Sequence, residues 1–125
     1  MDFQQTLEQH LKAIKSHNLS AFAETLANDG SLILIFPNGR LMKNYEAIVD
    51  FHEDWFDDPD WDIEFKTIET QEEDRLAWVL LQVSYNDLDE DDMPYHLNYY
   101  LHLIFRKFGQ RWRLVFDQNT VMEEA

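Results

Sequence analysis

Residues 95–120 read YHLNYYLHLIFRKFGQRWRLVFDQNT and predict the largest part of the fold. Apolar and polar side chains alternate along both halves of this stretch, which is the period of a β-strand with one buried face. The short segment FGQR between the halves contains Gly109, and such a segment between two alternating runs is typical of a hairpin turn. The sequence therefore predicts an antiparallel pair of strands at about 95–107 and 111–120.

The length of the turn sets the register of this hairpin. If FGQR forms an even-numbered connection, the residues on either side of it pair outward one by one. His102 then faces Asp117, and Tyr100 faces Asn119. One side of the hairpin collects these polar groups. The other side carries the apolar residues Leu101, Leu103, Phe105, Trp112, Leu114 and Phe116.

The polar side of the hairpin has two interpretations. Polar faces of antiparallel sheets usually face water, and a His102–Asp117 pair would contribute about 0.2–1 kcal/mol there. Inside a cavity, the carboxylate would instead orient the imidazole, hold one tautomer and raise its pKa toward neutrality. That arrangement suits a general acid or base. The pattern alone leaves both interpretations open, although the solvated face is the commoner arrangement.

The rest of the chain predicts helices first and strands afterwards. Apolar residues recur at helical spacing near the N-terminus, either Asn18 or Ser20 would cap a second helix, and Asn44 a third. The predicted elements are helices beginning near residues 3, 18 and 44, a short hairpin at 31–42, and strands at about 61–70 and 75–86. This order predicts a single α+β domain over residues 1–125, in which helices cover one face of a curved antiparallel sheet.

Composition limits the classes of partner. The 125 residues are 45% hydrophobic and contain no Cys, which excludes disulfides and thiolate metal sites. With 25 Asp and Glu against 10 Lys and Arg, the formal net charge is −15, so the surface should repel nucleic acid and anionic membranes. No stretch approaches the roughly 20 apolar residues of a membrane span, and the N-terminus lacks the apolar run of a signal peptide. We therefore expect a cytoplasmic protein.

Three segments carry a resemblance to a known superfamily. They are LKAIKSHNLSAFAETLANDG at 11–30, PNGRLMKNYEAIVDFHEDWF at 37–56 and LIFRKFGQRWRLVFDQNT at 103–120. Through them the chain resembles the nuclear transport factor 2-like superfamily, especially its SnoaL-like and steroid-isomerase-like branches. The resemblance implies a cone-shaped, curved antiparallel sheet wrapped around three N-terminal helices. Because this scaffold hosts isomerases, dehydratases, cyclases, assembly hubs and ligand binders, the resemblance implies no single chemistry.

The resemblance favours the cavity interpretation of the polar side. Matching the turn before Trp112 to steroid-isomerase-like relatives puts His102 at the position of their oxyanion-stabilising acid. The apolar side would then be the convex surface that many relatives use for dimerisation. Matching on Gly109 instead shifts the last strand by one residue and reverses the assignment. The side chains that the first match brings to the cavity are Asn98, Tyr100, His102, Asp117 and Asn119.

Further candidate residues lie on the predicted helices. In steroid isomerases a carboxylate just before a Pro moves the proton, but Phe36 precedes Pro37 here and cannot accept one. Their first-helix Tyr matches His10, which would point into the cavity or lie at the edge of an amphipathic helix. His52 and Trp55 lie about one turn apart on the third helix and can contact a ligand. Since no HxH, HxxxH or HExxH spacing is present, we expect no metal and no cofactor.

Two functions follow from these observations. The first is a small-molecule-binding SnoaL-like protein with a central cavity, acting as a lyase or isomerase in which Asp117 orients His102. A small hydrophobic or aromatic ligand would be held by Trp55, Asn98, Tyr100, Asn119, His10 and His52. The alternative is a non-catalytic interaction module that pairs through one face of its sheet. A homodimer is expected in either case.

Overall fold

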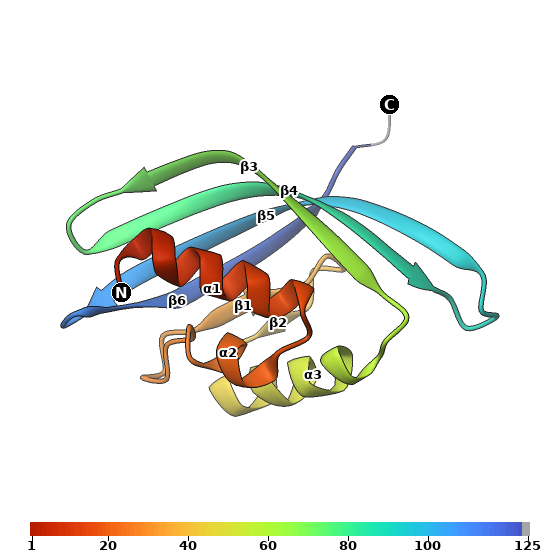
Figure 1. Ribbon diagram of the computed structural model, residues 1–125, viewed down its shortest axis with the longest axis horizontal. Coiled ribbons are helices and arrows are strands. Elements are labelled where there is room, and N and C mark those ends of the chain that lie inside the picture. The colour runs from red at the N-terminus through yellow and green to blue at the C-terminus, as the bar shows by residue number, and fades with distance from the viewer. Residues whose placement is uncertain (124–125) are drawn as a thin grey trace.

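Within residues 1–123, which a computed structural model describes, six strands form one open, curved sheet and three helices lie against its concave side (Figure 1). The helices are α1 (Phe3–Lys15), α2 (Leu19–Ala23) and α3 (Tyr45–Asp57). The strands are β1 (Ile33–Ile35), β2 (Leu41–Met42), β3 (Asp62–Glu72), β4 (Leu76–Leu88), β5 (Pro94–Phe108) and β6 (Arg111–Val121). The predicted α+β class, with a curved sheet around N-terminal helices, is confirmed.

The sheet is mixed rather than wholly antiparallel. Its strand order is β2-β1-β6-β5-β4-β3, and every neighbouring pair is antiparallel except β1 and β6. Because β1 pairs with β6, which is distant in the sequence, the local sequence pattern does not indicate whether the two strands run parallel or antiparallel. The parallel pairing sets Leu34 opposite Asp117.

Side-chain caps begin all three helices. Asp2 and Gln5 form a reciprocal capping box at the start of α1, with the Gln5 backbone N–H donating to the Asp2 carboxylate at 2.8 Å. Asn18 and Asn44 each accept a bond from a backbone N–H of the first turn of α2 and α3. In the described part of the chain, no helix combines the length and the apolar character needed to cross a membrane.

The hydrophobic core fills the space between the helices and the concave face of the sheet. The apolar side of the last hairpin belongs to this core, so it does not supply a dimer surface. Phe116 is the exception, because it lies on the opposite side of the strand beside His102. The fully or nearly fully buried core residues include Phe3, Phe22, Ile48, Val79, Leu81, Leu101, Leu103, Phe105, Trp112 and Leu114.

A β-bulge at Val115 changes the register of the last hairpin. The two strands pair as predicted from the turn as far as Phe105 and Leu114, but the next pair is Ile104 with Phe116, which leaves Val115 without a partner. Everything beyond that point shifts by one residue. A bulge of this kind carries no mark in the alternation of the sequence.

The shifted register separates the predicted pairs. His102 lies opposite Gln118 and not Asp117, and Tyr100 lies opposite Thr120 and not Asn119. Both predicted pairings are therefore wrong. The physical reason is a contact from outside the hairpin. The backbone N–H of Leu114 donates to the carbonyl of Thr25 at 2.7 Å, and the carbonyl of Leu114 accepts from the N–H of Ala27 at 2.9 Å.

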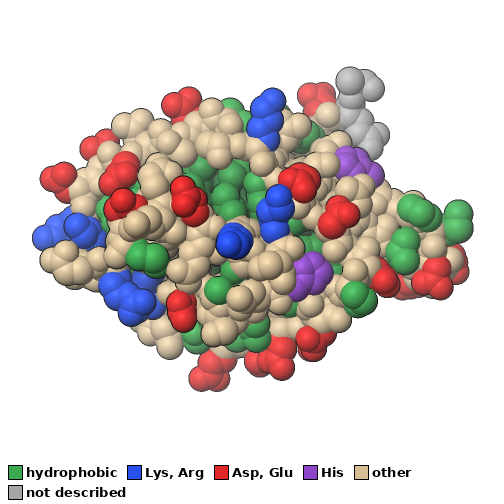
Figure 2. Space-filling view, in the orientation of Figure 1, with side chains coloured by type: hydrophobic (Ala, Val, Ile, Leu, Met, Phe, Trp, Pro, Cys, Tyr) green, Lys and Arg blue, Asp and Glu red, His purple; other side chains and the backbone are tan. Residues whose placement is uncertain are grey.

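The surface is strongly acidic. Figure 2 shows Asp and Glu side chains spread over the visible face, with Lys and Arg between them. Surface ion pairing is sparse: the described residues contain one, between Lys15 and Glu64 at 2.9 Å, with both side chains exposed. The 25 acidic side chains outnumber the 10 basic ones, and the resulting net charge of −15 gives the molecule a negative field.

Candidate functional site

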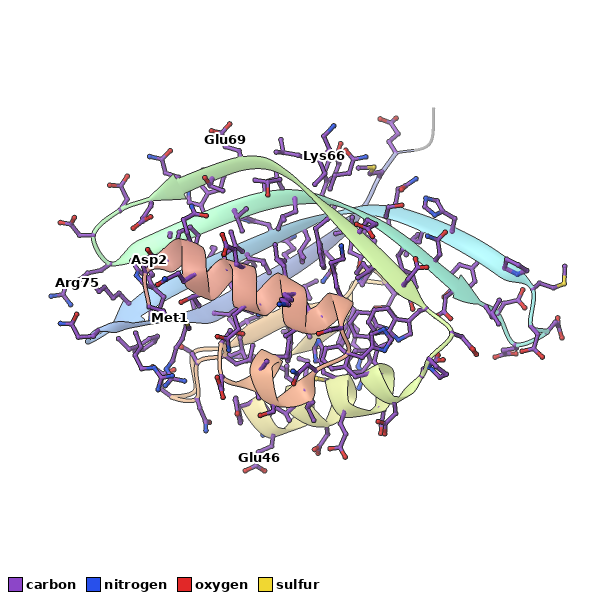
Figure 3. All side chains as sticks on the ribbon, in the orientation of Figure 1. Met1, Asp2, Glu46, Lys66, Glu69 and Arg75 are labelled. Carbon is purple, nitrogen blue, oxygen red and sulfur yellow. The ribbon has the colours of Figure 1, made fainter. Side chains whose placement is uncertain are left out.

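A cavity of about 180 Å³ lies between α3 and the concave face of the sheet. Figure 3 shows ring side chains gathered in this region, while the labelled Lys66, Glu69 and Arg75 extend into solvent at the outer edge of the sheet. The volume is close to that of an apolar cavity of about 150 Å³ that binds benzene, so it fits a ligand with one ring. Aliphatic and aromatic side chains form most of the wall, and the aromatic ones are Phe36, Phe51, Trp55, Phe65, Tyr85 and Tyr99.

Asp117 brings a carboxyl group into this wall. Its position opposite Leu103 turns its side chain to the concave side, where 8% of its surface stays exposed. Asn119, two residues along β6, donates through its Nδ2 to Asp117 Oδ1 at 3.0 Å and to the carbonyl of Ile35 at 2.8 Å. Burial raises the pKa of Asp117 to about 7, and the bond from Asn119 opposes this rise. The carboxyl group can therefore gain or lose a proton near neutral pH.

Two tyrosines lie in the same wall with different bonding. The Tyr85 hydroxyl accepts from Trp55 Nε1 at 3.2 Å and donates to the Asp87 carboxylate, so it is held by protein partners. Tyr99 lies on β5, and burial raises its pKa, with the negative charge of Asp117 adding to the rise. Tyr99 is therefore a neutral phenol and a hydrogen-bond donor at the cavity wall.

His52 contributes an acceptor from α3. Its Nδ1 lies 2.7 Å from the carbonyl of Ile48, and because a carbonyl can only accept, Nδ1 must carry the hydrogen. Nε2 is then left with a lone pair. Burial lowers the pKa of His52 to about 4, although the bond to Ile48 opposes the change, so the ring is neutral at pH 7. Phe22 stacks on this ring with centroids 4.3 Å apart, which fixes its orientation.

His10 lies behind the cavity and does not line it. The Thr25 hydroxyl donates to the Phe22 carbonyl at 2.6 Å, so His10 Nδ1 must donate to Thr25 Oγ1 at 2.7 Å. Nε2 is buried without a partner among the described residues. Burial lowers the pKa of His10 to about 3, with a smaller contribution from His52. Phe22 separates the two histidines, since each ring stacks on it.

The bulge divides the predicted site residues between the two faces of the sheet. Trp55, His52, Asp117 and Asn119 come together at the cavity. Tyr100 and His102 lie on the convex face in a shallow hollow beside Trp78 and Ile104. Asn98 is exposed and accepts from His96 Nε2 at 2.9 Å. The predicted convergence of Asn98, Tyr100 and His102 with Asp117 is thus wrong, because the shifted strand turns Asp117 and Asn119 to the other side.

The sequence itself gives the family. It matches the SnoaL-like domain over residues 4–122, which is nearly the whole chain. The chain belongs to the SnoaL-like family. Structures of the nuclear transport factor 2-like superfamily share its fold, in agreement with the resemblance seen in the sequence. A comparison with curated proteins found no match.

Three solved structures illustrate how widely this SnoaL-like fold is used. A proposed calcium/calmodulin-dependent protein kinase type II association domain from Thiobacillus denitrificans has a TM-score of 0.80 at 11% identity, covering 97% of this chain and 95% of its own. A proposed dehydratase of the NTF2-like family from Streptomyces avermitilis has a TM-score of 0.79 at 8% identity, covering 97% and 94%. A ketosteroid isomerase-like protein from Erwinia carotovora has a TM-score of 0.79 at 14% identity, covering 97% and 94%. At these identities the likeness shows the fold alone.

Sequence reasoning missed the aromatic wall of the SnoaL-like cavity. Tyr85 and Tyr99 lie on the same side of their strands as the core residues and look like ordinary buried positions. Trp61 was not predicted as part of the site, yet its ring stacks on Trp55 with centroids 4.1 Å apart and on His17 with centroids 3.8 Å apart. The one signal in the sequence was the hydroxyl of Tyr99, a polar group on the side of the hairpin that was predicted to be apolar. Over residues 1–123, no group of three His, Asp or Glu side chains is arranged to hold a metal ion.

Proposed function

We propose that this SnoaL-like chain binds a small, single-ring molecule in the cavity between α3 and the sheet. The observation that carries the proposal is the buried Asp117 carboxyl in the wall of an aromatic cavity of about 180 Å³. Buried carboxyl groups with strongly perturbed pKa values cluster at functional sites. Apolar walls with a few polar groups are the usual composition of a ligand site, where the walls supply affinity and the polar groups fix orientation.

The same carboxyl group supports proton transfer to or from the ligand. A general acid or base works best when its pKa is near the working pH, and Asp117 meets this condition with a pKa of about 7. Tyr99 would donate a hydrogen bond to negative charge that develops on the ligand. This chemistry is that of a lyase or isomerase. Asp117 takes the role that the sequence had given to His102, because His102 lies on the other face of the sheet.

Matched variants test where the ligand binds. Leu101→Phe adds bulk at the cavity wall, whereas Leu80→Phe makes the same change in the convex hollow one strand away. We expect NMR titration with benzyl alcohol to show binding to the unchanged protein and to Leu80→Phe, and weakened binding to Leu101→Phe. If Leu80→Phe abolished binding of benzyl alcohol while Leu101→Phe left it unchanged, the proposal would be overturned.

Isotope exchange tests the proton transfer. In deuterated buffer, the protein should accelerate exchange of the hydrogens next to the carbonyl of a small ring ketone such as cyclohexenone. The acceleration should be lost in Asp117→Asn and retained in His102→Ala. Loss in His102→Ala with retention in Asp117→Asn would contradict the assignment of the acid–base group.

The convex face supports a second candidate function, which is pairing of two copies of this chain. The hollow that contains Trp78, Leu80 and His102 is largely apolar, and Tyr100 and Leu76 keep 40% and 43% of their surface exposed beside it. Exposed apolar surface of this kind is typical of interfaces. The cavity lies on the other side of the sheet, so pairing and ligand binding are compatible.

Light scattering checks the pairing. We expect a dimer at micromolar concentration and a monomer after Tyr100→Asp. A matched control is Thr67→Asp, which adds the same charge on exposed β3 away from the hollow. A monomeric unchanged protein would exclude this candidate.

A further inference from the structure

We propose that the ligand of this cavity is a small organic cation, a ring compound carrying a protonated amine, and that the Asp117 carboxylate is its counter-ion. The inference rests on the proposed binding function and names the chemical class of ligand. Three independent features of the cavity point to a cation: the aromatic wall, the inventory of polar groups, and the charge of the whole molecule.

The aromatic wall is the first feature. Ring faces carry partial negative charge and attract an ammonium group, most strongly at Trp. Trp61 covers one face of Trp55, with centroids 4.1 Å apart and ring planes inclined by 10°. Trp55 nevertheless lines the cavity, so its other face or edge is available there. Phe36 and Phe51 meet edge to face at 4.6 Å and extend the wall, which gives a cation several rings to contact.

The polar groups are the second feature. Among the described residues that line the cavity, Asp117 is the one charged group and neither Lys nor Arg is present. His52 Nε2 is an acceptor, because its Nδ1 donates to the backbone. Asn119 Nδ2 donates two hydrogen bonds within the protein, to Asp117 and to the carbonyl of Ile35, and the side-chain oxygen of Asn119 is an acceptor. Acceptors therefore outnumber donors, and an ammonium group offers three N–H donors and no acceptor.

An anionic ligand would be repelled by the Asp117 carboxylate and would find no Lys or Arg in the cavity lining that the structure describes. Its charge would lie in a low-dielectric space with the Asp117 carboxyl, and like charges repel strongly there. Arg40 lines a separate hollow that shares Phe36, Pro37 and Phe51 with the cavity wall. It is exposed on the turn between β1 and β2, outside the cavity lining.

The charge of the molecule is the third feature. The formal net charge of −15 raises the local concentration of small cations and lowers that of anions. Figure 2 shows acidic side chains spread over the visible face, with Lys and Arg between them. Asp87 lies next to the wall itself, because its carboxylate accepts from the Tyr85 hydroxyl. A cation is therefore favoured on its approach as well as in the bound state.

Binding of a cation would change the protonation of Asp117. Burial holds the pKa of Asp117 near 7 in the free protein, and a positive ligand at the carboxyl group would lower it. The other titratable groups in the cavity wall are Tyr85 from β4, Tyr99 from β5 and His52 from α3, while Asn119 of β6 bonds to Asp117 and β1 sets Leu34 opposite it. Tyr85, Tyr99 and His52 are all neutral at pH 7, so Asp117 is the group in the wall that titrates. The ion pair keeps the carboxyl group ionised, which is also the state of a general base.

Three size-matched probes test the inference. Benzylamine is cationic, benzyl alcohol is neutral and benzoate is anionic, and each has one ring. We expect benzylamine to bind at least about tenfold more tightly than benzyl alcohol at pH 8, and benzoate to bind most weakly. Between pH 6 and pH 8 the ionised fraction of Asp117 rises from about a tenth to about nine tenths, so the affinity for benzylamine should rise about tenfold. Isothermal titration calorimetry measures both the affinities and the proton released.

Two variants complete the design. Asp117→Asn should remove the preference for benzylamine and its pH dependence, while benzyl alcohol still binds. His102→Ala, on the other face of the sheet, should leave the preference for benzylamine and its pH dependence unchanged. Equal or tighter binding of benzyl alcohol at pH 8 would overturn the inference and leave the proposed binding function intact. Tightest binding of benzoate would overturn it in favour of recognition through Arg40. Binding of no probe would count against the proposed function as well.

Discussion

Replacing Asp117 with Asn should stabilise the folded protein at neutral and alkaline pH but not at acidic pH. Asn has nearly the same shape and can still accept the bond from Asn119 Nδ2 through its own carbonyl oxygen. It cannot ionise, however. In the unchanged protein, burial raises the pKa of Asp117 from 3.8 to about 7, so the folded state resists ionisation of this group.

The sign and the size of the effect follow from linkage. Between pH 3.8 and about 7 the unfolded chain releases the proton from Asp117 while the folded protein keeps it, so the stability contributed by this group falls as the pH rises. The contribution is complete below about pH 3.8 and lost above about pH 7. One pKa unit corresponds to about 1.4 kcal/mol, so the whole loss is about 4 kcal/mol.

Urea unfolding from pH 4 to pH 8 measures this difference. The free energy of unfolding of Asp117→Asn minus that of the unchanged protein should increase by about 4 kcal/mol across this range, because the other titrating groups are shared and cancel. The new amide hydrogens add an offset that does not vary with pH. A difference that stays flat from pH 4 to pH 8 would refute the burial of an ionisable carboxyl group in the cavity wall.

Three further predictions concern groups around the core and cavity. Phe105→Ala should lower the free energy of unfolding by about 3–5 kcal/mol in urea, because Phe105 is fully buried against Phe3 and His10; a loss below 1 kcal/mol would contradict this packing. Burial lowers the pKa of His10 to about 3, so the unfolded chain takes up the proton first as the pH falls below 6.5. His10→Phe should therefore lose less stability than the unchanged protein between pH 7 and pH 4, and equal losses would refute it. Asn119→Ala should raise the pKa of Asp117 further, since it removes the bond that lowers it; carbon-13 NMR of the carboxyl group measures this, and an unchanged pKa would exclude the bond.

Local signals predicted much of the fold. Asn18 and Asn44 begin helices because their side chains satisfy free backbone N–H groups, and this requirement is visible in the sequence. The two-residue turn at Gly109 sets the first pairs of the last hairpin, and Gly109 adopts a φ of 61°, which favours glycine. These interactions join residues close together in the chain, so alternation and capping patterns record them.

The site depended on interactions that the sequence pattern does not record. The backbone of Leu114 pairs with Thr25 and Ala27, and the adjacent bulge at Val115 moves Asp117 to the concave side. A shift of one residue reverses every later side chain between the two faces of a sheet. Asp117 was therefore identified as a candidate but given the wrong partner, and His102 was assigned to the wrong face.

The parallel pairing of β1 with β6 is also an interaction between distant segments that the sequence pattern does not record. Ile33–Ile35 is a strand of three residues, too short to reveal which neighbour it would choose. That pairing sets Leu34 beside Asp117 and presents the Ile35 carbonyl to Asn119. The cavity wall is thus built from contacts between distant segments.

Intermolecular NMR contacts with a bound ring compound test the account most directly. Benzylamine at pH 8, with the methyl groups of the protein labelled, should show nuclear Overhauser effects to Leu34, Ile63 and Leu101, which line the cavity on the concave side. Effects to Leu80 and Ile104 instead would place the ligand in the convex hollow beside His102 and contradict the assignment of the site.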